Sequence, residues 1–228
     1  TVVAAVIILF TLRNKSKDTK IKAARLLSSL SLAFYIADLF IMPLAYGEID
    51  IEKLPFHACT AMCVACFLSY HSKALENYRT SFAMLGFISN LVYLIYPAGV
   101  MWHAVHPLSY RVIQTLLFHS IMTLSCLLTL IYESDKINIK KCYRDLAVTI
   151  GMTAWACLGN LLYNNDQRFY NWFFVVRDPF YALPESHAPF IMPFVLLNGE
   201  VKDWQILLSL LSLILMIVAV AAIGIRIY

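Results

Sequence analysis

Five polar side chains interrupt the apolar segments of this chain, and their types could support covalent chemistry. They are Asp38, Cys59, Asn90, His119 and Asn160. Polar groups in hydrocarbon are costly, so they usually face the interior of a helix bundle and indicate a functional site. Counting 1.5 Å per residue from the expected helix ends puts all five in the same half of the membrane, with His119 about 12 Å deep. The sequence therefore predicts one polar layer.

Cys59 and His119 have the side-chain types of a nucleophile and its base. An imidazole can take the thiol proton, and the resulting thiolate can attack a carbonyl carbon. We expect Asp38 to orient the imidazole. An amide of this layer would donate a hydrogen bond to the oxyanion that forms, and the candidates are Asn90, Asn160 or Gln114. The alternative interpretation is structural, because free Cys is a common small buried residue. For any one of these residues alone the structural interpretation is favoured, whereas the polar layer as a whole favours a pocket.

Metal binding is a weaker interpretation of two other patterns. Cys59, Cys63 and Cys66 recur at i, i+4 and i+7 on one helix face, a spacing that could hold a soft metal. Packing of small residues explains it better, because no second thiol cluster lies at a matching depth. His103 and His106 form H-x-x-H in a loop that has no nearby carboxylate. We therefore expect no metal and no cofactor.

The composition predicts an all-α, polytopic membrane helix bundle. Of 228 residues, 61% are hydrophobic and only 14% are charged, and the mean hydropathy is +0.70. Soluble domains carry roughly 25% charged residues. The basic residues lie in short loops without interleaved aromatic residues, which argues against nucleic-acid binding.

About seven transmembrane helices are expected, since roughly 20 residues cross a membrane. The predicted spans are 1–12, 23–46, 55–70, 80–97, 110–132, 145–163 and 203–226. The first is short and opens with Thr1 rather than Met, so we expect a helix that begins outside this chain. The segment 164–202 is rich in aromatic residues. It is either a re-entrant or interfacial helix that covers the pocket, or an aromatic surface loop.

The placement of Lys and Arg predicts an N-out, C-in orientation. Thirteen of the 18 basic residues fall in or beside the loops expected on one side, and five fall on the other. Loops rich in Lys and Arg stay in the cytoplasm. The polar layer then lies in the extracytoplasmic or luminal half of an integral membrane protein, of the plasma membrane if bacterial or an endomembrane if eukaryotic.

Several short motifs resemble one family of membrane proteins. Residues 54–60, Leu-Pro-Phe-His-Ala-Cys-Thr, resemble the L-P-L-H/Q-L-C-S helix entry of the YwaF-type and transmembrane protein 164 family. Later landmarks follow in the same order, namely Tyr96-Pro97, Phe118-His119 and residues 171–179. The similarity extends over nearly all of residues 24–226. Ala58, Thr60 and Trp172 depart from the family's usual Leu, Ser and Tyr.

The resemblance implies a lipid acyltransferase that moves a fatty acyl group between glycerophospholipids through a cysteine acyl-enzyme. Cys59 matches the family cysteine and His119 the membrane histidine. On this basis the expected substrates are membrane phospholipid and lysophospholipid, bound or oriented with the help of Asp38, Asn90, Asn171 and Arg177. Arg177 could hold a lipid phosphate.

The expected function is therefore a phospholipid acyltransferase with a Cys/His pair in the extracytoplasmic half of the bundle. The main alternative is a non-catalytic seven-helix protein, such as a receptor, a transporter element or a complex subunit, which would use the polar layer for ligands or for helix packing. A lipid hydrolase of similar chemistry is a further alternative, and a zinc-dependent hydrolase ranks last.

Overall fold

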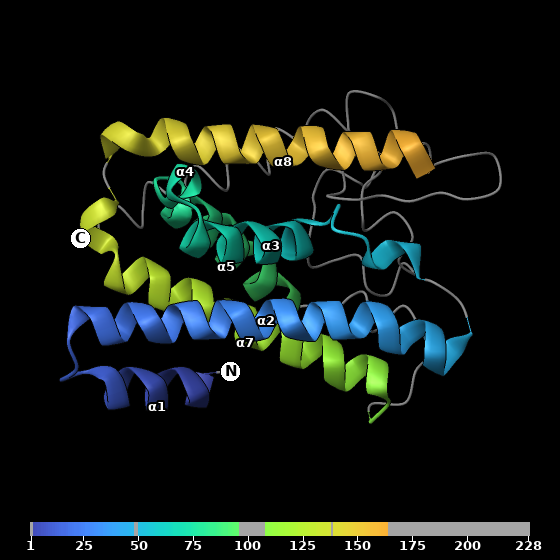
Figure 1. Cartoon of the computed structure of the whole chain (residues 1–228), viewed down its shortest axis with the longest axis horizontal. Helices are drawn as coiled ribbons and strands as arrows, with labels where there is room; N and C mark the ends of the chain where they lie inside the picture. Colours follow the sequence, from blue (N-terminus) through green and yellow to red (C-terminus); the bar gives the residue numbers. More distant parts are fainter. Residues whose placement is uncertain (1, 48–49, 96–107, 138, 164–228) are drawn as a thin grey trace, which may run out of the picture.

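A computed structural model gives the fold of residues 2–47, 50–95, 108–137 and 139–163 (Figure 1). All regular structure in these ranges is helical. The α-helices are α1 (Val2–Leu12), α2 (Lys17–Tyr46), α3 (Ala58–His71), α4 (Lys73–Glu76), α5 (Arg79–Ile95), α7 (Tyr110–Tyr132) and α8 (Cys142–Tyr163), with short 3-10 turns at Ile51–Lys53, Ser134–Lys136 and Ile139–Lys141.

Three of the helices are long and apolar enough to cross a membrane. They are Lys17–Leu44 of α2, α7 and α8, and α1, α3 and α5 are shorter apolar helices. The predicted class, an all-helical membrane protein, is confirmed at this level. The count of seven spans and the N-out orientation stay predictions. The expected span 203–226 and the aromatic segment 164–202 lie outside the described residues.

The second helix begins six residues before the predicted span because a capping residue precedes it. The Oγ of Ser16 accepts a hydrogen bond from the backbone N–H of Thr19 at 3.3 Å, which satisfies one free donor of the first turn. The helix ends at Gly47, whose positive φ of 77° lets its N–H donate to the carbonyl of Pro43. The basic segment after the first helix is therefore largely helical.

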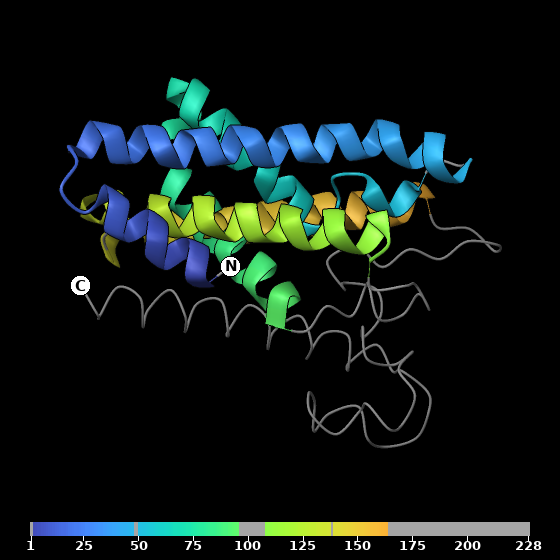
Figure 2. The same cartoon turned by 90° about the horizontal axis from the view of Figure 1, so that it is seen from below.

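The helices form three layers (Figures 1 and 2). The helices α2 and α5 both pack on α7, α3 packs on α5 and α2, and α8 covers the other side of α5. Seen in Figure 1, α8 lies above α3 and α5, and α2 lies below them. The start of α3 is consequently enclosed by helices from distant parts of the chain.

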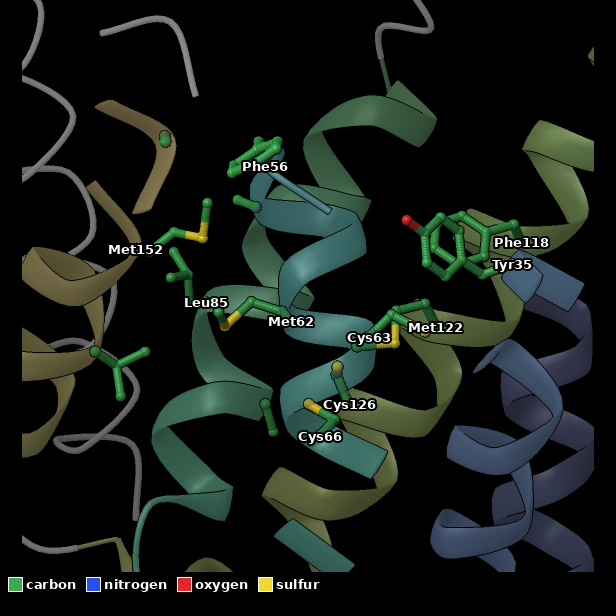
Figure 3. Packing of buried hydrophobic residues seen from close by; sticks show 14 residues of the cluster. Tyr35, Phe56, Met62, Cys63, Cys66, Leu85, Phe118, Met122, Cys126 and Met152 are labelled. Atoms are coloured by element: carbon green, nitrogen blue, oxygen red, sulfur yellow. The ribbon is translucent and has the colours of Figure 1, made fainter. Parts of the chain in front are cut away.

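Sulfur-containing side chains fill the centre of the core (Figure 3). Met62, Cys63 and Cys126 are at most 5% exposed. A Cβ atom added to Gly86 would lie 3.0 Å from the sulfur of Cys126, so glycine lets α5 approach α7 closely. The thiols of Cys63 and Cys66 thus serve packing here, and Cys63 also contacts the hydroxyl of Ser31 at 3.3 Å.

A buried ion pair joins the helices at the end far from Cys59. The guanidinium of Arg79 donates to the carboxylate of Glu133 at 2.8 Å and to the carbonyl of Ser69 at 2.8 Å. It also lies 4.4 Å from the centre of the Tyr70 ring. These contacts tie the ends of α3 and α7 to the start of α5.

Candidate active site

Cys59 is the second residue of α3 and is half-buried. The helix begins after His57, the N-cap residue, whose carbonyl accepts from the Thr60 hydroxyl at 3.1 Å. Backbone N–H groups in a first helical turn have no partner within the helix and stabilise negative charge nearby. The Cys59 sulfur lies beside the backbone N–H of Thr60. The end of α3 therefore offsets part of the cost that burial imposes on a thiolate at this position.

His119 of α7 is held by Asn90 of α5. The Nδ1 atom of His119 lies 2.7 Å from the Oδ1 atom of Asn90, and the Nδ2 atom of Asn90 donates to the carbonyl of Gly86 at 2.7 Å. The carbonyl can only accept, so it fixes the amide with its Oδ1 atom toward the imidazole. Nδ1 must then carry the proton, and Nε2 is left with the lone pair that a general base needs.

Aromatic rings fix the plane of the imidazole. The ring of Tyr93 stacks on His119 with the centroids 3.9 Å apart and an angle of 14° between the planes. Phe118 meets His119 edge-on at 5.1 Å. Tyr93 follows Asn90 by three residues, so both lie on one face of α5. One helix face therefore supplies both the hydrogen-bond acceptor and the stacking ring.

Cys59 and His119 have neighbours in common. Tyr93, stacked on His119, is within electrostatic range of Cys59. Lys53 is within the same range of both Cys59 and His119. The first turn of α3 and the middle of α7 thus share Tyr93 and Lys53 as neighbours.

Asp38 takes a different place from the one expected. One of its carboxylate oxygens lies 2.9 Å from the Nζ atom of Lys53, and the other accepts from the hydroxyl of Tyr110 at 3.1 Å. Asp38 is 2% exposed, and a buried carboxylate needs such partners. The expectation that Asp38 orients the imidazole was wrong, because Asn90 makes that bond.

Lys53 anchors the segment that leads into α3. Its ammonium pairs with Asp38, and its backbone carbonyl accepts from the hydroxyl of Tyr35 at 2.7 Å. Nearby, Arg111 pairs with Asp50 at 3.3 Å. In the sequence, Lys53 stands out only as one of the five basic residues expected on the less basic side. The signal for its role was the need of a buried acid for a counter-charge.

The remaining predicted residues are distributed over other parts of the chain. Asn160 is buried on α8, next to Gly159, which packs on the ring of Phe56 before α3. Gln114 is buried on α7 and accepts from the Thr115 hydroxyl at 3.3 Å. Asn171, Arg177, His103 and His106 lie outside the described residues. Within the described ranges, no three His, Cys, Asp or Glu side chains form a group that could hold a metal ion.

Comparison with known proteins supports the resemblance seen in the sequence. The model of the TMEM164 family matches residues 1–223. No curated protein and no solved structure matches the chain. The family match covers nearly the whole chain, including the helices that hold Cys59, Asn90 and His119. This chain is therefore a membrane protein that belongs to the TMEM164 family.

Proposed function

We propose that this protein is a membrane-embedded phospholipid acyltransferase with Cys59 as nucleophile and His119 as general base. The observation that supports it best is the Asn90–His119 hydrogen bond, which leaves the lone pair of the imidazole on Nε2. The half-buried thiol of Cys59, at a helix start, has Tyr93 and Lys53 as neighbours in common with His119.

In the first half-reaction, the Nε2 atom of His119 takes the proton of the Cys59 thiol. The sulfur attacks the ester carbonyl carbon of a phospholipid and forms a tetrahedral intermediate. The intermediate collapses to an acyl thioester as the C–O ester bond breaks. The leaving alkoxide takes the proton from the imidazolium, and a lysophospholipid departs.

In the second half-reaction, the hydroxyl of an acceptor lysophospholipid gives its proton to the same Nε2 atom. Its oxygen attacks the thioester carbon, the C–S bond breaks, and the Cys59 sulfur recovers the proton. Asn90 keeps the imidazole in one tautomer throughout, which is how an amide partner assists a Cys/His pair.

Three further residues have supporting roles in this proposal. Asp38 acts through Lys53, which holds the segment before α3 and so positions Cys59. Asn171 and Arg177 would contact the lipid head group from the extracytoplasmic or luminal side. Their roles rest on the resemblance alone.

The proposal is tested by acyl transfer in reconstituted vesicles. The full chain is incubated with a phospholipid carrying a labelled acyl chain and an unlabelled lysophospholipid, and label in the new phospholipid is measured. Cys59→Ala should abolish transfer, and His119→Ala should lower its rate by about 10²- to 10⁴-fold. Transfer that persists at the wild-type rate in Cys59→Ala would refute the assignment.

Free fatty acid is measured in the same experiment. Labelled fatty acid as the sole product, whatever lysophospholipid is offered, would identify a hydrolase that uses the same pair. A wild-type chain that releases neither product and forms no adduct would favour the non-catalytic alternative.

A further inference from the structure

A second, separate feature lies on the face of α8 that packs toward α3 and α5. There an open apolar groove of about 360 Å³ runs between these helices and α4. Its lining includes Ala61, Leu75, Tyr78, Phe82, Gly151 and Trp155. This volume is within the range of small-molecule sites, roughly 300–1,000 Å³. The groove shares none of its lining residues with the Cys59–His119 region.

One end of the groove carries positive charge. Arg144 of α8 lies 5.7 Å from the centre of the Tyr78 ring, which lines the groove. Arg144 and Lys141 also line a small polar pocket with Thr80, Ser81 and Asp145. Arg144 therefore connects the apolar groove to the polar pocket.

The charges in the polar pocket leave a net positive site. Asp145 is bonded to the hydroxyl of Ser81, and among the described residues neither Arg144 nor Lys141 forms an ion pair with a carboxylate. Arg144 instead donates to the carbonyl of Asn77 at 2.8 Å and to the Tyr143 hydroxyl at 3.2 Å. Two cations against one acid suit a ligand with a single negative charge.

We infer that the groove and the polar pocket together bind one anionic phospholipid. An acyl chain lies in the groove along α8, and the head-group phosphate accepts hydrogen bonds from Arg144 and Lys141. Lipid is the apolar material that surrounds these helices in a membrane, and basic side chains at a helix end attract anionic head groups. The polar pocket lies at the opposite end of α3 and α5 from Cys59, and the groove runs from there along α8 toward Ala61 in the first turn of α3. With the predicted orientation, the pocket and the phosphate bound there belong to the cytoplasmic leaflet.

Native mass spectrometry of the full chain in detergent micelles tests the inference. Dioleoyl phosphatidylglycerol and dioleoyl phosphatidylcholine are titrated separately, and one-to-one adducts are counted. We expect a saturable adduct that forms at lower concentration with phosphatidylglycerol. Arg144→Gln and Lys141→Gln should each weaken it about five-fold, whereas Lys15→Gln, in the basic loop before α2, should leave it unchanged.

A matched pair of substitutions on α8 tests the groove itself. A Cβ atom at Gly151 meets nothing within 4 Å, so Gly151→Leu should fold and fill the groove, and we expect it to lower adduct formation at least ten-fold. Ala154→Leu lies one turn along the same helix, off the groove lining, and should have no effect.

Three results would overturn the inference. They are equal binding of the two lipids by wild type, an adduct unaffected by Gly151→Leu, and a change of oligomeric state rather than of lipid binding in Gly151→Leu. Glycerophosphoglycerol, which has no acyl chains, should not compete with phosphatidylglycerol for this site. Competition by it would also contradict binding through an acyl chain in the groove. Cys59→Ala should retain the adduct, so this inference and the acyl-transfer proposal fail independently.

Discussion

The amide of Asn90 determines the tautomer of His119, with the proton on Nδ1 and the lone pair on Nε2. Its own Nδ2 atom is committed to the carbonyl of Gly86, so only its Oδ1 atom faces the imidazole. At this position, a side chain without an acceptor atom would leave the imidazole free to adopt either tautomer. The proposed chemistry therefore depends on a residue that acts through the imidazole.

Substitution of Asn90 tests this dependence. Asn90→Leu should lower the kcat of acyl transfer by about 10²-fold with little change in KM, because the base loses its fixed tautomer. Asn90→Asp still offers an oxygen to Nδ1–H and should remain within about ten-fold of wild type. The two kinetic constants are measured in the vesicle assay. Equal kcat values for wild type and Asn90→Leu would show that the hydrogen bond is only structural.

At the residue scale, helix counting gives each polar side chain an expected depth but not its partners. Depth follows from the constant rise of a helix. The partner of His119 depends on how α5 and α7 are rotated about their axes, which one chain's polar pattern does not define. The expected orienting residue, Asp38, was wrong for this reason. Tyr93 could have been found, because it follows Asn90 at i+3.

At the scale of elements, α8 packs through Gly159 against the segment that precedes α3. A Cβ atom there would lie 2.5 Å from the Phe56 ring. On the same side of that ring, Trp155 stacks on Phe56 at 5.0 Å, and its Nε1 atom donates to the carbonyl of Pro55 at 2.6 Å. The residues just before Cys59 are thus held by two positions of one helix.

Gly159→Ala should therefore destabilise the fold by about 1–3 kcal/mol, as overpacking does. Gly151→Ala is the matched control on the same helix, since its Cβ would meet nothing within 4 Å; it should be neutral or stabilise by about 0.5–1 kcal/mol. Thermal unfolding in detergent measures both. An unchanged Tm for Gly159→Ala would contradict the packing described here.

The element boundaries were harder to predict than the elements. Apolar stretches longer than a turn indicated helices, and helices are present in each of the six expected spans that the structure describes. The start of α2 was set by Ser16, a cap that precedes a basic rather than an apolar stretch. Hydropathy alone therefore placed that start too late.

At the scale of the whole molecule, the buried pair of Arg79 and Glu133 fixes the end of the bundle opposite Cys59. Removing one partner of such a pair leaves an uncompensated charge, so Arg79→Met should cost about 3–5 kcal/mol. The double variant Arg79→Met, Glu133→Leu should recover most of that loss. Denaturant unfolding of the single and double variants is compared. A double variant less stable than Arg79→Met would contradict this account.

The orientation of the bundle has its own test. Cys142 is exposed at the start of α8, in the region expected to face the cytoplasm. A membrane-impermeant maleimide should label it in inside-out vesicles but not in right-side-out vesicles, and Cys142→Ser should remove that signal. Labelling of Cys142 from the outside alone would reverse the predicted orientation.

The class of the protein and its family were readable from the sequence, because apolar composition and the short motif around Cys59 are local properties. The arrangement of α8 across α3 and α5 was not, since it depends on contacts such as that of Gly159 with Phe56. The groove proposed to bind a phospholipid arises from this arrangement. The spacing of residues within any one segment does not predict this groove.

The proposed mechanism requires that Cys59 carries the acyl group, and this is tested by locating the acylated residue in the protein. The chain is incubated with a phospholipid in the absence of acceptor, digested, and the modified peptide is located by mass spectrometry with and without hydroxylamine, which cleaves thioesters. We predict one hydroxylamine-sensitive acyl group on the peptide containing Cys59, absent from Cys59→Ala. An acyl group on any other residue, with Cys59 unmodified, would contradict the mechanism.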